Sequence, residues 1–324
     1  METTMQSNIS INLWEKNNKK SAWTSRSSRP RRSSSQQPLS SEAFLRHRNK
    51  PVSKKIEDPK KLIKKGERPV RVFWLWGLEQ IGSNMNVVEY ENDILVIDAG
   101  MEFADDNMPG VDYIIPDVSY LVAKKKNIKG IVITHGHLDH IGALKNILEP
   151  LGYPTIYTAP LTIGMIKRSL DEKDAKNLKF KLVDPDMDIF KLGVFTLEFF
   201  RVNHSIPESM GLSLHTPKGL LVFSGDFKID FTPAIDKPAD LGKISRIGQE
   251  GVRLYLWEST NANKPGHSVS EKVIGENIDK VINAYKHQRM IVSTFASNVG
   301  RIIQIINSAV KYDKVVFLAG RSMV

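Results

Sequence analysis

Short apolar runs, each closed by polar or turn-forming residues, dominate the chain from Val70 onward. A run of four to eight residues rich in Val, Ile, Phe and Tyr is typical of a strand buried in a sheet. The runs at 84–90 and 93–100 predict a hairpin whose turn contains Glu91 and Asn92. Further strands are expected at 70–76, 130–134, 155–160, 195–203, 210–216, 219–226 and 252–260.

Apolar residues at helical spacing predict helices at 141–151 and 161–170. After about residue 262 the pattern changes to a regular alternation of helix and strand. A Ser-x-x-Glu capping box at 268–271 predicts the start of a helix that continues to about His287. The remaining expected elements are a strand at 290–297, a helix at 298–311 and a strand at 314–320.

These patterns predict an α/β protein in three parts. They are a tail at 1–66, a β-rich α/β domain at 67–262, and the start of a second α/β unit at 263–324. Two strands and two helices are too few for an independent open sheet. We therefore expect a C-terminally truncated chain, either a fragment of a longer reading frame or a shortened protein with reduced or no activity.

Composition narrows the classes of protein. The hydrophobic content of 41% suits a soluble globular protein. No apolar run approaches the ~18 residues that span a bilayer, so no membrane association is expected. There is no cysteine, which excludes disulfides and thiolate ligands. Any bound metal must therefore be held by nitrogen and oxygen atoms.

The net charge of +10 belongs to the tail, because residues 1–68 contain 17 Lys and Arg but only 6 Asp and Glu. The remainder is close to neutral. The Ser-, Arg- and Pro-rich stretch at 25–41 has too few apolar residues to fold, so the tail is predicted to be disordered. It is interpreted as a solubilising or tethering segment, as a nucleic-acid contact, or as an organelle transit peptide.

Three of the 8 histidines lie within six residues, in the sequence HGHLDH at 135–140. Side chains at i and i+2 near the end of a strand point the same way, which places His135 and His137 on one side of a pocket. The following turn directs Asp139 and His140 towards a second, neighbouring point. Such a cluster predicts two adjacent sites for divalent metal ions.

Two residues downstream follow other predicted strands and extend this cluster. His204 comes at the end of one strand and is soon followed by a proline, and Asp226 comes at the end of another. Asp226 has two carboxylate oxygens with which it could bridge two ions. We expect both residues to be metal ligands.

The HxHxDH pattern, followed by a strand-end His and then an Asp, resembles the metallo-β-lactamase superfamily. Further segments resemble the ribonuclease J family, a β-CASP group within it, and the resemblance covers about 67–324. The resemblance implies an αββα sandwich with the start of an inserted β-CASP α/β domain. The segments are GLEQIGSNM (77–85), DAGMEF (98–103), NHSIPES (203–209), SGDFKIDFTP (224–233), ESTNANKPG (258–266), FASNVGR (295–301) and GRSM (320–323).

The resemblance also implies two Zn²⁺ ions per chain, with Mn²⁺ or Mg²⁺ as alternatives. By that analogy Asp226 is a ligand of both ions. One ion is also held by His135, His137 and His204, and the other by Asp139 and His140. The implied activity is that of a zinc-dependent ribonuclease, acting as a 5′→3′ exonuclease and an endonuclease in rRNA processing and mRNA decay. A hydroxide activated by the two metals would attack the RNA phosphodiester.

Two more acidic residues are expected to assist Asp139 and Asp226 in catalysis. Asp98 resembles the aspartate that orients a metal ligand or the metal-binding loop, although an Asp ending a strand can be structural. Glu258 matches the acidic residue that opens the β-CASP motifs. Proton transfer and the positioning of a histidine both remain open as its role.

Four polar residues of the second unit are candidates for binding RNA or phosphate, because donors beside helix N-termini favour anions. Alternatively, they are only helix caps and turn residues. The implied partner is RNA, preferentially 5′-monophosphorylated, and a homodimer or homotetramer is expected at full length in the cytoplasm. The four residues are Ser297, Asn298, Arg321 and Ser322.

Two other functions remain open at this point. The HxHxDH motif also serves hydrolases of small esters and thioesters, so the motif alone does not decide the substrate. A complete ribonuclease J continues beyond GRSM and supplies a further zinc-ligand histidine that is not in this sequence. An inactive RNA-binding fragment, with affinity supplied by the tail, is therefore the third hypothesis.

Overall fold

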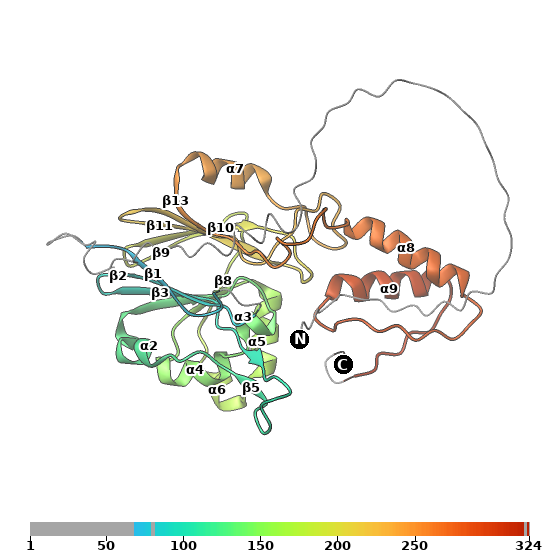
Figure 1. Cartoon of the computed structure of the whole chain (residues 1–324), viewed down its shortest axis with the longest axis horizontal. Helices are drawn as coiled ribbons and strands as arrows, with labels where there is room; N and C mark the ends of the chain where they lie inside the picture. Colours follow the sequence, from blue (N-terminus) through green and yellow to red (C-terminus); the bar gives the residue numbers. More distant parts are fainter. Residues whose placement is uncertain (1–67, 79–81, 321–322, 324) are drawn as a thin grey trace, which may run out of the picture. The chain divides into compact units, whose positions relative to one another are not determined.

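The computed structural model describes residues 68–78, 82–320 and 323, and the tail predicted at 1–66 lies outside them. Residues 68–324 make one unit. Figure 1 shows two sheets that face each other, with α4 (Leu144–Leu151) outside one sheet and α7 (Leu241–Gln249) outside the other. This arrangement confirms the expected αββα sandwich.

The first sheet has the strand order β1-β2-β3-β6-β7-β8. β1, β2 and β3 pair antiparallel, whereas β3, β6, β7 and β8 run parallel. Parallel neighbours require crossover connections, which the helices on the outer face supply. The strands are β1 (Arg71–Trp76), β2 (Met85–Tyr90), β3 (Asp93–Ile97), β6 (Ile128–Val132), β7 (Ile156–Thr158) and β8 (Phe180–Leu182).

The second sheet has the order β13-β12-β11-β10-β9, in which only the β12–β13 pair is parallel. A separate two-stranded ribbon joins β4 (Glu102–Phe103) and β5 (Tyr113–Ile114). The strands of the second sheet are β9 (Ile189–Leu192), β10 (Phe195–Arg201), β11 (Met210–Thr216), β12 (Gly219–Phe223) and β13 (Val252–Leu256).

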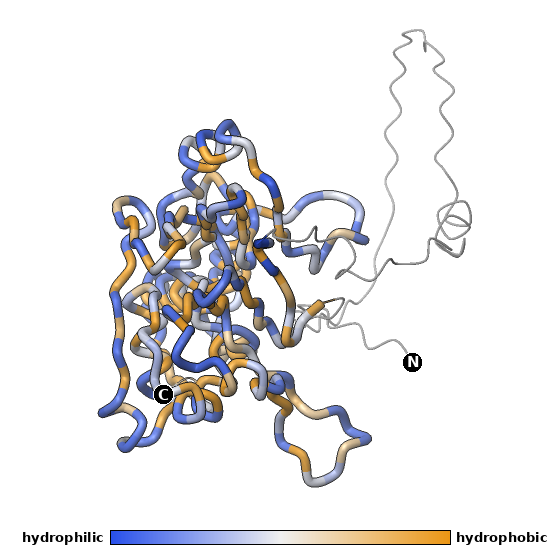
Figure 2. Tube along the Cα trace, turned by 90° about the vertical axis from the view of Figure 1, so that its left-hand side faces the viewer, coloured by the Kyte–Doolittle hydropathy of each residue, from blue (hydrophilic) through white to orange (hydrophobic). Residues whose placement is uncertain are grey.

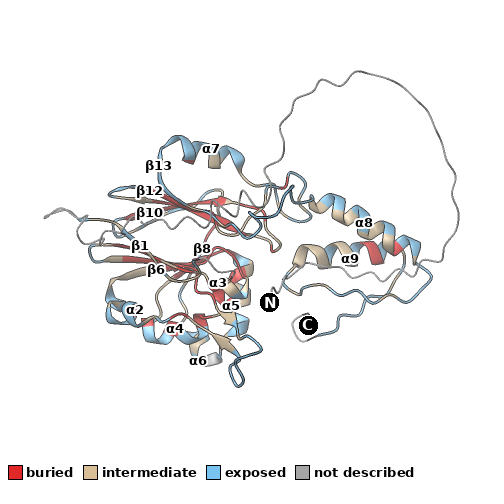
Figure 3. Cartoon of the chain, viewed as in Figure 1, coloured by how far each residue is buried: buried red, intermediate tan, exposed pale blue. Residues whose placement is uncertain are grey.

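The core lies on both faces of the first sheet. In β3, Ile94 and Val96 belong to the cluster that packs beneath the helices, whereas Leu95 and Ile97 belong to the cluster between the sheets. A strand buried on both faces needs a continuous apolar run, which explains the sequence ILVI. Figure 3 shows this burial as red strands at the centre of the sandwich.

The helix expected at 141–151 begins later, as α4 (Leu144–Leu151), and a separate short helix, α3 (Leu138–Ile141), precedes it. Gly152 ends α4 in the left-handed region, with φ of 79°. Glycine adopts that conformation without a clash, and so ends the helix before Pro154. The other helices of this part are α2 (Ser119–Ala123), η2 (Lys125–Asn127), α5 (Pro160–Ser169) and α6 (Glu172–Asn177).

The region predicted as a second unit, 263–324, contains α8 (Glu271–Ala284) and α9 (Val299–Lys311). The predicted capping box is wrong, because the hydroxyl of Ser270 and not Ser268 caps α8. The Glu271 carboxylate lies 2.6 Å from Lys228 Nζ and 3.3 Å from the Arg301 guanidinium, so it does not turn back to the start of the helix.

The strands expected at 290–297 and 314–320 are not formed, and neither segment has a strand partner among the described residues. Most of their side chains are exposed, with Ile291 at 96% and Phe317 at 88% of full exposure. An apolar run becomes a strand only where a neighbouring strand satisfies its backbone polar groups. The apolar pattern indicates a preference for strand, but within the described chain these two segments have no partner strand and do not form one.

No helix in the described part of the chain is both long and apolar enough to cross a membrane. Figure 2 shows hydrophobic and hydrophilic stretches mixed along the described chain.

The buried Glu89 carboxylate of β2 fastens α2 to the first sheet. It accepts hydrogen bonds of 2.5 Å from both Tyr120 and Lys124. Burial alone would raise the pKa of Glu89, but these bonds and the charges of Lys124 and Arg71 outweigh it, so the pKa is lowered. A lowered pKa means that the carboxylate stabilises the fold at neutral pH.

Glu89→Gln is expected to lower the free energy of unfolding by about 1.5–3 kcal/mol at pH 7, towards the lower end because Lys124 is partly exposed. The wild-type carboxylate contributes fully above its unfolded pKa of about 4.3, and the contribution is lost as pH falls through the lower folded pKa. Urea unfolding of both proteins from pH 7 to pH 3 measures the difference. A gap that stays constant with pH would contradict the proposed role of the charge.

Candidate metal centre

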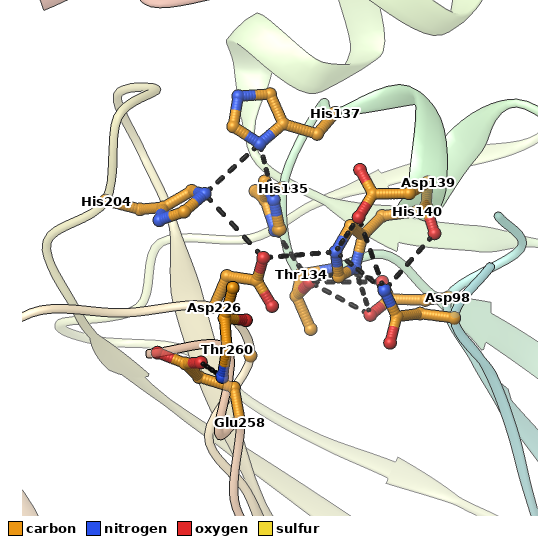
Figure 4. A network of polar contacts seen from close by, with 12 residues as sticks. Asp98, Thr134, His135, His137, Asp139, His140, His204, Asp226, Glu258 and Thr260 are labelled. Carbon is orange, nitrogen blue, oxygen red and sulfur yellow. Dashed lines mark hydrogen bonds and ion pairs between the residues drawn. The ribbon is translucent and has the colours of Figure 1, made fainter. Parts of the chain in front are cut away.

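The six predicted metal ligands come from three separate segments, and the fold brings them together (Figure 4). His135 and His137 follow β6, whereas Asp139 and His140 lie in α3. His204 follows β10 of the second sheet, and Asp226 follows β12. The loops at one end of the two sheets therefore supply the whole cluster.

Three imidazole nitrogens form the first ligand group. His137 Nδ1 lies 3.0 Å from His135 Nε2 and 3.2 Å from His204 Nε2, and the three ligand atoms lie within 4.8 Å of one another. A tetrahedral ion with metal–nitrogen distances of about 2.0–2.1 Å needs donors roughly 3.3 Å apart. The spacing in this group fits a zinc-sized ion.

His135, His140 and Asp226 form a second group, whose ligand atoms also lie within 4.8 Å of one another. Asp139 Oδ2 adds a carboxylate oxygen 3.4 Å from His140 Nε2. Asp226 Oδ2 lies 3.6 Å from His140 Nε2 and 3.8 Å from His204 Nε2, and so it reaches both groups. A carboxylate between two cation positions is the arrangement that a two-ion site needs.

Buried polar contacts to the Nδ1 atoms of two histidines orient these ligands. Asp98 Oδ2 lies 2.8 Å from His140 Nδ1, which leaves Nε2 of that ring facing the cluster. Asp98 also accepts a 2.8 Å bond from the backbone N–H of Thr134, whose hydroxyl lies 3.0 Å from His135 Nδ1. Such outer partners fix the tautomer and the direction of metal-binding histidines.

The loop that carries His204 is held at its far end. The Glu208 carboxylate accepts a 2.7 Å bond from the N–H of Leu161, at the start of α5. The backbone N–H of Glu208 in turn donates to Asp236 at 3.0 Å. The bond to Leu161 ties the loop that carries His204 to α5, a helix that packs on the first sheet, and so helps to fix the distance between His204 and the HGHLDH segment.

Burial controls the charge of the first group. It lowers the pKa of His135 well below the usual range and the pKa of His204 to about 4. Burial is also the main reason that the pKa of His137 is lowered. The three rings are therefore neutral at pH 7, and each keeps a lone pair that can bind a cation.

Carboxylates control the second group. Burial lowers the pKa of His140, but the charge of Asp98 and the bonds to Asp139 and Asp226 outweigh burial and raise it well above the usual range. Burial raises the pKa of Asp226, yet the bond and charge of His140 lower it to about 2. Burial likewise raises the pKa of Asp139, but the bond and charge of His140 outweigh burial, so that pKa is lowered as well. Both carboxylates are therefore ionised at neutral pH, as cation ligands must be.

Glu258 lies outside both ligand groups. Its carboxylate accepts a 2.8 Å bond from the backbone N–H of Thr260, and its own N–H donates to the Ser224 hydroxyl at 3.1 Å. The bond to Ser224 joins Glu258 to the loop that leads into Asp226.

The candidate RNA-binding residues are only partly brought to the cluster. The backbone of Ser297 hydrogen-bonds to the His137 ring, and this bond opposes the larger lowering of that ring's pKa by burial. The side chain of Asn298 caps α9 by accepting a 3.1 Å bond from the N–H of Arg301. The predicted sites Arg321 and Ser322 lie outside the described residues.

Sequence reasoning missed three polar residues that contact the ligands. Besides Thr134, the Ser205 hydroxyl lies 3.4 Å from His137 Nε2, and the Asn84 amide nitrogen lies 3.1 Å from His140 Nε2. Thr134 and Ser205 each adjoin a ligand in the sequence, which is a usable signal. Asn84 stands 56 positions before His140, and only the segment GLEQIGSNM marked its neighbourhood.

Comparison with known proteins shows two family matches. The family model described as the metallo-beta-lactamase superfamily matches residues 78–263. The model described as the ribonuclease J beta-CASP domain matches residues 287–324.

Curated relatives are named ribonuclease J. The chain is 40% identical over 267 residues to Ribonuclease J of Mycoplasma pneumoniae, covering 82% of this chain and 46% of the relative. It is 41% identical to Ribonuclease J 1 of Streptococcus pyogenes, covering 78% and 45%. Ribonuclease J of Thermus thermophilus is 40% identical, with the same coverage. The chain thus spans about half the length of the curated relatives it matches.

A solved structure supports the fold alone. A protein of unknown function from Enterococcus faecalis V583 aligns with a TM-score of 0.52 and 17% identity, covering 74% of this chain and 63% of that one.

Proposed function

Because this chain belongs to the metallo-beta-lactamase superfamily, we propose that the protein is a zinc-dependent ribonuclease that hydrolyses RNA phosphodiester bonds. One observation carries the proposal. Two ligand groups, with Asp226 near members of both, occur in a chain about 40% identical to several proteins named ribonuclease J.

The donor atoms favour zinc. Three neutral imidazoles suit a borderline ion better than the oxygen-preferring Mg²⁺. His135, His137 and His204 would hold one ion, and Asp139 and His140 the other, with Asp226 shared. Bound zinc supplies Lewis acidity, which acidifies water and stabilises negative charge on the phosphoryl oxygens.

The residues of the chain then set the charge and the geometry. The carboxylates of Asp139 and Asp226 carry too little negative charge to neutralise two bound dications, so the loaded site would be positive and would favour an anionic phosphodiester over a neutral ester. Asp98 holds the His140 ring, and burial keeps the imidazoles of the first group neutral. Asp98 and Glu258 are proposed to act through the residues they position.

The finer parts of the function belong to the same proposal. They comprise 5′→3′ exonuclease and endonuclease activity on 5′-monophosphorylated RNA, in rRNA processing and mRNA decay in the cytoplasm, by a homodimer or homotetramer. Ser297, Asn298, Arg321 and Ser322 are proposed to bind the RNA backbone. The resemblance to ribonuclease J supports these points.

The test is cleavage of 5′-monophosphorylated RNA by the protein and by its Asp139→Ala/His140→Ala variant. We expect the variant to lose cleavage by a factor on the order of 10³. His267→Ala is the matched control, since this exposed histidine lies outside the ligand groups. Equal rates for parent and double variant would refute the two-ion proposal, and turnover of a lactone or thioester without RNA cleavage would favour the small-ester hydrolase.

A further inference from the structure

Asn84, just before β2, is fixed in place by its backbone. Its N–H donates to the carbonyl of Asp139 at 2.9 Å, and its own carbonyl accepts from the N–H of Gly100 at 2.9 Å. The two residues before it lie in left-handed conformations, with φ of 96° for Gly82 and 62° for Ser83. This tight turn delivers the Asn84 side chain to the second ligand group.

The side-chain amide points at the atom that a cation would use. Asn84 Nδ2 lies 3.1 Å from His140 Nε2, and 3.4 and 3.5 Å from the carbonyl and the Oδ2 of Asp139. The other nitrogen of the His140 ring is engaged by Asp98 at 2.8 Å. Nε2 is therefore the ring atom left for a cation, and Asn84 contacts that same atom.

An amide can satisfy Nε2 in either of its protonation states. Its N–H donates to a lone pair, and after a turn of the amide its oxygen accepts from an N–H. A cation on Nε2 excludes both contacts, because one nitrogen lone pair serves one partner. The amide then keeps the carbonyl and the carboxylate of Asp139 as partners.

We propose that Asn84 is a positioning residue that competes with the cation for Nε2 of His140, and so makes the second ion the weaker and more readily exchanged of the two. This inference rests on the proposed function, since it concerns one of the two ion positions. In the first group, no such amide contact is made to His135 or His204 among the described residues.

Removing the amide should therefore strengthen binding of the second ion. Without Asn84, Nε2 is a buried polar atom that lacks its amide partner until the cation arrives, and this difference favours the bound form. A change of about tenfold in affinity is expected, which corresponds to about 1.4 kcal/mol. The lost contact should also make the metal-stripped variant unfold at a lower temperature than metal-stripped wild type. Zinc binding should restore the unfolding temperature of the variant.

The experiment titrates the chelator-stripped 324-residue chain with Zn²⁺ in competition with a chromogenic chelator, and follows thermal unfolding in parallel. Asn84→Ala should bind the second ion about tenfold more tightly and leave the first unchanged. Asn84→Asp keeps the shape, removes the N–H and adds a charge, so its increase should be larger. Asn86→Ala, a half-buried asparagine two residues along, is the control and should match wild type.

Unchanged or weaker second-ion affinity in Asn84→Ala would overturn the inference. If that variant does not fold, the same result in Asn84→Asp overturns it. A wild-type chain that binds fewer than two zinc ions would instead overturn the proposed function, and the inference with it. The two failures are therefore distinguished by the wild-type titration.

Discussion

Asp226→Ala is expected to slow RNA cleavage by a factor on the order of 10³ or more, and to reduce bound zinc from two ions to at most one. The reason is geometric. Asp226 Oδ2 lies 3.6 Å from His140 Nε2 and 3.8 Å from His204 Nε2, so a single substitution removes an oxygen that lies near ligands of both groups. Loss of a ligand in either group alone would spare the other.

Two readouts separate the causes of such a loss. Zinc per chain, measured by elemental analysis after dialysis, reports the ligand role, and cleavage of 5′-monophosphorylated RNA reports the chemistry. Asp226→Asn keeps the size and one oxygen, so it should retain more zinc than Asp226→Ala. Asp106→Ala removes an exposed carboxylate away from the cluster and should match wild type. Full zinc content in Asp226→Ala would show that Asp226 is not a shared ligand.

The elements around the centre were predictable because each depends on a local pattern. The hairpin of β2 and β3 follows from two apolar runs and a polar turn, and Glu91 adopts the left-handed φ of 55° that such a turn needs. The histidine cluster was equally visible, because four candidate ligands occupy six consecutive residues. Strand ends also predicted that His204 and Asp226 would lie near it.

Contacts between distant segments could not be predicted in this way. No pattern in the sequence around Asn84 predicts that its backbone pairs with Asp139. That pairing depends on how a loop meets a helix 55 residues later. The absent strands at 290–297 and 314–320 show the converse limit. Their apolar composition favours a strand, but pairing is a property of neighbours and not of the segment itself.

Gly100 lies where the Asn84 loop, the end of β3 and the helix that carries Asp139 are in close backbone contact. It follows β3, and its N–H donates to the Asn84 carbonyl at 2.9 Å. A Cβ built on Gly100 would lie 1.7 Å from the Asp139 carbonyl oxygen and 2.7 Å from the Asn84 nitrogen. Both obstacles are backbone atoms, so no side-chain rotation can relieve the overlap.

Gly100→Ala is therefore expected to lower the free energy of unfolding by about 3 kcal/mol or more, and to displace Asp139 from the second ligand group. Gly164→Ala is the matched control, because this helical glycine of α5 has open space at its Cβ. Alanine there should raise stability by about 0.5–1 kcal/mol, since it favours the helix. Urea unfolding of both variants and zinc titration of the folded fraction measure the two effects.

The opposite signs matter, because the same chemical change then separates the close approach of Gly100 to Asp139 from any general effect of replacing glycine. A Gly100→Ala protein with wild-type stability and two bound zinc ions would show that the loop, the helix and the strand end do not need this contact to build the second group.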